Sequence, residues 1–231
     1  MGGTQSYGQF CPVAMATEIV CTRWTPLILR ELFAGSSRFN DLRKGLPRMS
    51  PTLLSKRLKE LETAGIVERV RGGDGSWHYG LTTSGEDLKP VVFGLGLWGQ
   101  RWLEAQTSLK NLDPSLLMWD MRRNLDPTPL LPRRAVIQIL YPELPRPRRY
   151  WWLIVEGREV DLCSIDPGFD VDLHVVSDLR TMTAIWMGLT TVGEETASGR
   201  LKLMGDEFLG ASMQQWLGLS PFAGEERRVA S

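Results

Sequence analysis

The segment from Thr52 to Ala64 would separate its side chains into an apolar face and a donor-rich face if it formed a helix. At about 100° per residue, Leu54, Leu58 and Leu61 fall on one side. The opposite side carries hydroxyls and long cations, which can donate hydrogen bonds to phosphates and to base edges in a wide groove. An ordinary solvated helix also presents such a face, so the neighbouring elements must decide. The donors are Thr52, Lys56, Lys59 and Thr63.

The elements before this segment predict a helix-turn-helix. A short helix is expected over 39–44, ending before Gly45 and Pro47, and Ser50-Pro51 supplies a cap and a proline for the next helix. A short helix, a turn of about six residues and a second helix form the helix-turn-helix arrangement. This context favours DNA contact for the donor face, and Arg38 joins the predicted DNA-binding residues.

Two strand-like runs, 66–71 and 76–81, follow the second helix. The glycine-rich stretch Gly72-Gly73-Asp74-Gly75 between them predicts a hairpin, which we interpret as a wing. Arg71 and His78 flank its tip, where a flexible hairpin can reach phosphates or the adjacent minor groove. The alternative is an ordinary exposed hairpin whose aromatic side chains pack on the body.

The charges are unevenly distributed on a chain of 231 residues with a formal net charge of zero. From Ser36 to Arg71 there are nine basic and four acidic side chains, whereas 107–231 carries 14 basic and 17 acidic ones. A local basic excess on a neutral protein suits a factor that touches a polyanion through one face.

Two further helices are expected before this region and one after it. The first two are predicted over 12–22 and 26–34, and the last continues to about Glu104. The last helix places apolar side chains on one stripe, a surface that a single domain would leave partly exposed. The stripe consists of Leu88, Val92, Leu95, Trp98 and Trp102.

The second half of the chain predicts a separate domain, with the boundary between residues 106 and 107. Strands are expected over 135–141, 150–156, 159–165, 171–176 and 200–204, with helices over 178–187 and 207–216. The fold class is therefore α+β: a winged helix-turn-helix domain, mostly α with a two-stranded wing, over 1–106, followed by an α+β domain with an antiparallel sheet over 107–231.

Several classes of function have no support in the sequence. The three cysteines have no pairing or metal-ligand spacing, and the first residues do not resemble a signal peptide. No apolar run approaches the roughly 20 residues that span a bilayer. His78 and His174 fall in different domains, and no nucleophile elbow or phosphate loop is present. We expect a cytoplasmic protein without a cofactor, metal site, catalytic residues or membrane partner.

Motifs of the first half, in order, resemble those of the HxlR-type winged-helix regulators over about residues 9–105. These motifs are Cys11-Pro12-Val13, Arg23-Trp24-Thr25, LILREL from Leu27, RFNDL from Arg38, SPTLLSKRLKEL from Ser50 and IVER from Ile66. The resemblance implies bacterial homodimers that bind double-stranded operator DNA and pair through the first helix and the helix after the wing.

The resemblance also implies which residues contact the groove, and its set differs at the edges from the helical projection. It assigns contact to Ser50, Pro51, Thr52, Ser55, Lys56 and Arg57, whereas the projection favours Lys59 over Ser55 and Arg57. Cys11 occupies the position of a cysteine that several members use to sense oxidants or electrophiles. A thiol senses such compounds when its pKa is lowered, and a position at a helix N-terminus can lower it. The alternative interpretation is that Cys11 is a small buried apolar residue without a sensing role.

The chain extends well past the usual end of that family, and residues 130–220 resemble the sterol carrier protein type of lipid-binding domain. The resemblance rests on the strand series, Asp170-Val171-Asp172-Leu173 and the run from Gly199 to Asp206. It implies a cavity for a fatty or sterol-like molecule, and the alternative is that the large apolar side chains form core. The predicted pocket residues are Trp151, Trp186, Met187, Met204, Phe208 and Trp216, with Trp152 and Met213 as further candidates.

Together these observations predict a homodimeric transcriptional regulator that binds operator DNA and is not an enzyme. A small apolar ligand in the second domain, or thiol chemistry at Cys11, would modulate it. The alternative function is a lipid or small-ligand carrier whose first domain serves mainly for association.

Overall fold

The computed structural model describes residues 6–73, 75–104, 109–130 and 133–228. The chain forms two compact units, Met1–Gly96 and Leu97–Ser231, and helix α6 (Lys89–Trp102) contains the division between them. The boundary predicted between residues 106 and 107 falls outside the described residues and stays a prediction. Within the described parts of the chain, no helix combines the length and apolar character needed to cross a bilayer.

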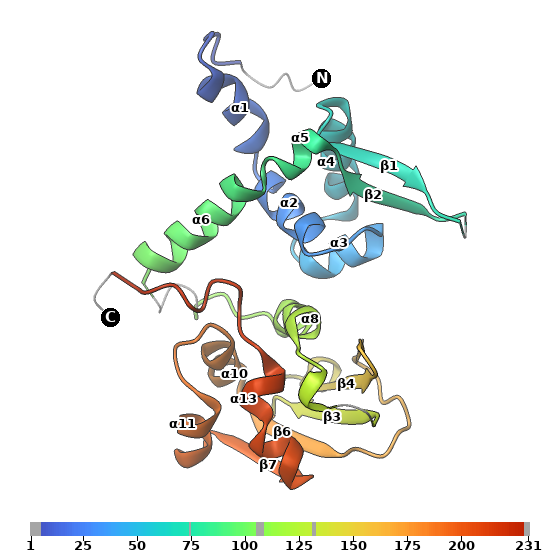
Figure 1. Cartoon of the computed structure of the whole chain (residues 1–231), viewed down its shortest axis with the longest axis vertical. Coiled ribbons are helices and arrows are strands. Elements are labelled where there is room, and N and C mark those ends of the chain that lie inside the picture. Colours follow the sequence, from blue (N-terminus) through green and yellow to red (C-terminus); the bar gives the residue numbers. More distant parts are fainter. Residues whose placement is uncertain (1–5, 74, 105–108, 131–132, 229–231) are drawn as a thin grey trace. The chain divides into compact units, whose positions relative to one another are not determined.

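The N-terminal unit is a helical body with a two-stranded wing (Figure 1). Prolines in the first turn start three of its helices, since their missing N–H groups have no helical partner at that place. The elements are α1 (Pro12–Val20), α2 (Thr25–Phe33), α3 (Phe39–Gly45), α4 (Pro51–Thr63), β1 (Val67–Arg71), β2 (Trp77–Leu81), α5 (Thr83–Glu86) and the first part of α6. The predicted helix-turn-helix and wing are confirmed.

The core of the N-terminal unit holds α4 by its apolar face. Leu54, Leu58 and Leu61 are all buried, as the helical projection predicts, and they pack in one cluster with Ile28 of α2 and Leu42 of α3. Burying a leucine side chain contributes about 1.5–3 kcal/mol, so this face determines which way α4 is turned.

The C-terminal unit combines one five-stranded sheet with helices, which confirms the α+β class. Three of its α-helices, α8, α9 and α11, were not predicted, and the single helix expected over 207–216 is divided into α12 and α13. Asp113 caps α8 by accepting bonds from the N–H groups of Ser115 and Leu116. The elements are α8 (Pro114–Asn124), η1 (Thr128–Leu130), β3 (Ala135–Leu140), α9 (Arg146–Arg149), β4 (Tyr150–Glu156), β5 (Glu159–Cys163), β6 (Leu173–Ser177), α10 (Leu179–Trp186), α11 (Val192–Ala197), β7 (Leu201–Gly205), α12 (Glu207–Ala211) and α13 (Met213–Leu217).

The sheet has the strand order β5-β4-β3-β6-β7, and one of its pairs departs from the antiparallel expectation. Strands β3 and β6 are parallel, whereas the other three pairs are antiparallel. The reason is the connection 164–172, which carries the chain from edge strand β5 to the far side of β3 before β6 begins. A crossover of this kind returns the chain in the same direction.

Alternation along the strands assigns the two faces of the sheet. Ile137, Leu153, Val175 and Leu201 belong to the buried cluster that also contains side chains of α8, α10 and α13. Successive residues on a strand point to opposite faces, so the neighbours of these residues point away from that cluster.

Candidate nucleic-acid interface

The exposed face of α4 carries the donors that the sequence predicted. Thr52, Ser55 and Lys59 are exposed, and the Lys56 side chain is 63% exposed. Ser50 lies at the N-cap, where its Oγ accepts a hydrogen bond from the Leu53 N–H at 3.3 Å, and exposed Pro51 begins the helix. The N-terminal end of α4 thus presents hydroxyls and positive helix-dipole charge, both of which suit a phosphate.

An acidic residue on the same helix holds two of the cations. Glu60 lies 3.9 Å from the Lys56 ammonium and accepts a bond from the Arg57 guanidinium. The Arg57 side chain is only 19% exposed, and its Nε is buried without a hydrogen-bond partner. The helical projection and the family resemblance differed on Ser55, Arg57 and Lys59. Ser55 and Lys59 are exposed, whereas the Arg57 side chain pairs with Glu60 along the helix.

A buried carboxylate positions the first helix of the motif. Glu31 of α2 accepts from the Arg30 guanidinium at 2.8 Å and from the Ser36 hydroxyl at 3.4 Å, and Arg30 also donates to the Gly45 carbonyl at 3.0 Å. A Cβ atom on Gly45 would lie 1.9 Å from a Glu31 oxygen. This network ties the end of α3 to α2.

His78 anchors the wing to the body. Its Nδ1 lies 3.1 Å from the Ser37 hydroxyl and its Nε2 lies 2.8 Å from the Ser76 hydroxyl. The Tyr79 N–H also donates to the Ser37 carbonyl at 2.7 Å. Both ring nitrogens of this half-buried histidine therefore have partners inside the protein, and contact of His78 with DNA stays a prediction.

The wing itself presents arginines stacked on a tryptophan. The guanidinium carbons of Arg69 and Arg71 lie 4.1 and 5.7 Å from the centre of the Trp77 ring, which is 46% exposed. Strand register places Trp77 opposite Arg71, so these side chains share one face of the hairpin. Arg38, the remaining predicted contact, is exposed at the N-cap of α3.

Cys11 lies at the N-cap of α1, with Pro12 in the first turn. Hydrogen bonds from the backbone N–H groups of Ala14 and Val13 lower the pKa of the Cys11 thiol below its ordinary value. Cys11 is half-buried, whereas Cys21 just beyond the same helix is exposed. The geometry is that of a thiol whose ionised form is stabilised at a helix start.

Apolar side chains remain exposed along α1 and α6. Val13 and Met15 on α1 are 69% and 58% exposed, and Leu95 and Trp98 on α6 are 54% and 58% exposed. The apolar stripe predicted on the last helix is therefore exposed only in part. Leu88 and Val92, which the spacing assigned to the stripe, pack against the core of the N-terminal unit.

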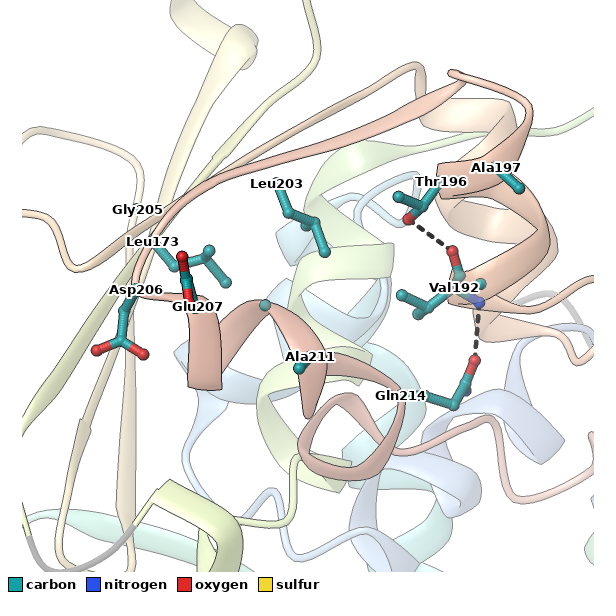
Figure 2. Close-up of a pocket in the computed structure, with 12 residues that line it drawn as sticks. Leu173, Val192, Thr196, Ala197, Leu203, Gly205, Asp206, Glu207, Ala211 and Gln214 are labelled. Atoms are coloured by element: carbon teal, nitrogen blue, oxygen red, sulfur yellow. Dashed lines mark hydrogen bonds between the residues drawn. The ribbon is translucent and has the colours of Figure 1, made fainter.

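In the C-terminal unit, helices α11, α12 and α13 border an open groove over the end of the sheet. Its volume is about 780 Å³ (Figure 2). Leu173 and Leu203 come from β6 and β7, and Asp206 and Glu207 lie at the β7 end, away from Thr196 and Ala197. The other lining residues are Val192, Gly193, Gly205, Gly210, Ala211 and Gln214.

The six predicted pocket residues are not among those that line this groove. Trp151, Trp186 and Trp216 belong to the buried cluster, half-buried Met187 packs against it, and the Trp216 Nε1 donates to the Leu209 carbonyl at 2.9 Å. Met204 and Phe208 are exposed. Of the two further candidates, Met213 is buried in the same cluster, and Trp152 follows Trp151 on β4 and so points to the opposite face of the sheet.

Comparisons with known proteins match the N-terminal part of the chain. The family model described as HxlR-like helix-turn-helix matches residues 19–107. The HTH-type transcriptional regulator YvaP of Bacillus subtilis is 35% identical over 99 residues, which are 42% of this chain and 92% of YvaP. The HTH-type transcriptional regulator sll1512 of Synechocystis is 34% identical over 102 residues, 43% of this chain and 76% of sll1512.

Among solved structures, the reduced form of the transcriptional regulator YodB from B. subtilis is 33% identical, with a TM-score of 0.35, over 40% of this chain and 93% of that chain. The match to YvaP extends over nearly the whole of that regulator, and the residues that the family model matches contain the helix-turn-helix and the wing. This chain belongs to the HxlR-like helix-turn-helix family.

Proposed function

We propose that the chain is a transcription regulator that binds operator DNA as a homodimer, with α4 in the major groove and the wing on the adjoining backbone. The observation that carries this proposal is the donor face of α4, where Thr52, Lys56 and Lys59 are exposed directly opposite a buried leucine stripe. The names of its relatives as HTH-type transcriptional regulators support the same reading.

The experiment is selection of duplexes from a random library by the full chain, followed by fluorescence anisotropy with the selected duplex over a range of salt concentrations. A regulator shows an affinity that falls steeply with salt, because cations on the protein displace counterions from phosphates. A carrier whose N-terminal unit serves only for association selects no duplex, and that result would reject the proposal.

The homodimer is proposed because apolar side chains are exposed on α1 and α6. In the proposed dimer, a second copy of the chain covers these side chains. One recognition helix covers too few base pairs for operator-level specificity, whereas a dimer reads two half-sites about one helical turn apart. Trp98→Ser should shift the chain toward monomer in analytical ultracentrifugation. Trp77→Ser on the wing, which removes a comparably exposed tryptophan, should leave the dimer unchanged; a monomeric wild type at micromolar concentration contradicts the assignment.

Thiol chemistry at Cys11 is proposed as one means of modulation, supported by the lowered pKa of its thiol. The thiolate is the nucleophile, so Cys11 should be alkylated by iodoacetamide at neutral pH faster than the more exposed Cys21. Peptide mass spectrometry gives the two rates, and anisotropy on the alkylated protein gives the effect on DNA affinity. Faster alkylation of Cys21, or unchanged affinity after Cys11 is modified, removes Cys11 from the mechanism.

A small apolar ligand in the domain proposed to cover 107–231 is the second means of modulation. The groove between α11, α12 and β7 supports it, since a volume of about 780 Å³ falls in the range of small-molecule sites. A ligand changes DNA affinity only through its different affinities for the binding-competent and incompetent states. Coupling of about 1–3 kcal/mol corresponds to roughly a 5- to 150-fold change in affinity for the operator.

A further inference from the structure

The groove of the C-terminal unit is built from small residues. Ala197 of α11 and Ala211 of α12 lie on opposite sides of it (Figure 2), and Gly193 of α11 and Gly210 of α12 also line it. The three atoms nearest to a Cβ atom on Gly210 would belong to Leu203 and Leu173, at the ordinary contact distances of 3.7–3.9 Å. Because the side chains that face the space are short, the helices leave room that larger residues would fill.

The walls of the groove are held together by specific hydrogen bonds. Gln214 of α13 accepts from the Val192 N–H at 2.8 Å, which joins the C-terminal helices to the start of α11. Thr191 and Glu194 form a capping box on α11. On the other side, the Asp206 carboxylate caps α12 by accepting from the Leu209 N–H at 2.9 Å. These bonds hold the walls of the groove in place, which lowers the entropy cost of binding.

The charges that line the groove have one sign. Asp206 and Glu207 are the charged members of the lining set, and both lie at the β7 end (Figure 2). Arg133 pairs with Asp206 and offsets its charge. Glu207 is exposed and carries the remaining negative charge at this end. A carboxylate ligand such as a fatty acid would meet repulsion there, whereas a cationic group would be attracted.

We infer that this groove binds an amphipathic amine, with its apolar part over Leu173, Leu203 and Val192 and its ammonium group at the Glu207 carboxylate. The inference rests on the proposed ligand-modulated function and specifies the chemical class of the ligand. It differs from the fatty or sterol-like ligand that the sequence resemblance implied, because acidic side chains at the mouth of an apolar groove select against an anionic headgroup.

The test compares decylamine, decanoate and decanol, which share one alkyl chain and differ in the charge of the headgroup. Isothermal titration calorimetry with the full chain, below the concentration at which each probe forms micelles, gives the affinities. Decylamine should bind about two- to fivefold more tightly than decanol, the range expected for a partly exposed ion pair, and decanoate should bind more weakly than either. Raising the salt concentration should reduce the advantage of decylamine.

Two substitutions separate the headgroup contact from the apolar contact. Glu207→Gln should reduce decylamine affinity to that of decanol and leave decanol binding unchanged. Glu156→Gln removes an exposed carboxylate at the end of β4, which two strands separate from β7 in the sheet order, and should retain the preference for the amine. Gly210→Leu should weaken both probes because its side chain occupies the groove; Ala211→Phe serves the same purpose if the first variant does not fold.

Equal or tighter binding of decanoate, an amine preference that survives Glu207→Gln, or no binding of decylamine would overturn the inference. DNA affinity of the same variants, measured by anisotropy without any probe, distinguishes this failure from that of the proposed function. Intact DNA binding with no amine binding rejects only the groove assignment, whereas a wild-type chain that selects no duplex rejects the regulatory function itself.

Discussion

Arg101, in the last turn of α6, donates a hydrogen bond to Glu225 at 2.6 Å, although 124 residues separate them along the chain. Two neighbouring contacts follow the same path: the Arg228 N–H donates to the Arg101 carbonyl at 2.9 Å, and Arg227 donates to the Leu103 carbonyl at 2.8 Å. The described end of the chain therefore lies against the end of α6. All of these residues belong to the C-terminal unit, which includes the last residues of α6.

The Arg101–Glu225 pair should make stability depend on pH in the acid range. The hydrogen bond from Arg101 lowers the pKa of Glu225 below its ordinary value. A carboxyl group with a lowered folded-state pKa contributes stability above its unfolded pKa of about 4.3, and the contribution disappears as pH falls through the folded value. Glu225→Gln should therefore unfold at a lower temperature than wild type at pH 7, and this difference should shrink in acid.

Thermal unfolding followed by circular dichroism at a series of pH values measures the difference. Glu226→Gln is the matched control, since Glu226 is the adjacent exposed carboxylate. A gap between wild type and Glu225→Gln that is the same at every pH would show that the pair does not stabilise the fold through its ionisation.

Gly45→Ala should destabilise the N-terminal unit, because the added methyl group would overlap the buried carboxylate of Glu31. Overpacking a closed site costs about 1–3 kcal/mol in the free energy of unfolding. Chemical denaturation of Gly45→Ala, Glu31→Ala and the double variant forms a cycle. In the Glu31→Ala background, Gly45→Ala should cost less than in wild type, and strictly additive effects would mean that the two residues do not compete for space.

Lys56→Ala and Lys59→Ala should each weaken DNA binding without unfolding the protein, since both side chains are exposed on α4. A lysine that contacts phosphate lowers affinity for all sequences alike, and its removal reduces the salt slope by about one unit. Anisotropy titrations at several salt concentrations measure both quantities. Lys202→Ala, an exposed lysine on β7, is the control. Unchanged affinity and slope in both α4 variants would reject the groove assignment.

Glu60→Gln should strengthen DNA binding, because Glu60 holds the Lys56 ammonium and the Arg57 guanidinium in the free protein. Releasing two partly exposed ion pairs corresponds to about a two- to fivefold gain in affinity. Glu62→Gln removes the same charge from another exposed position of α4 and controls for the general change in helix charge. An equal gain in both variants would mean that the pairs of Glu60 do not restrain the cations.

The sequence by itself determined the elements whose signals are local. The spacing of Leu54, Leu58 and Leu61 places them on one face of a helix, whereas it fits no strand, in which alternate residues share a face. Ser50 caps this helix, and Pro51 is tolerated in its first turn because the N–H group that proline lacks has no helical partner there. The helix-turn-helix, the wing and most strands of the second unit followed from such patterns. Helix α8 was not predicted, although Asp113-Pro114 supplies the same kind of cap and proline at its start.

Only the tertiary structure decided which residues share a site. Large aromatic residues were expected to line a cavity, yet Trp216 is fully buried and Gly210 and Ala211 line the groove, since space remains where side chains are short. Leu203 lines the groove and Met204, which was predicted to, does not. Strand register determines which of the two faces the groove, because neighbours on a strand point to opposite faces. The hydrogen bond between His78 and Ser37 likewise depended on the tertiary structure, because 41 residues separate the two and no local pattern could pair them.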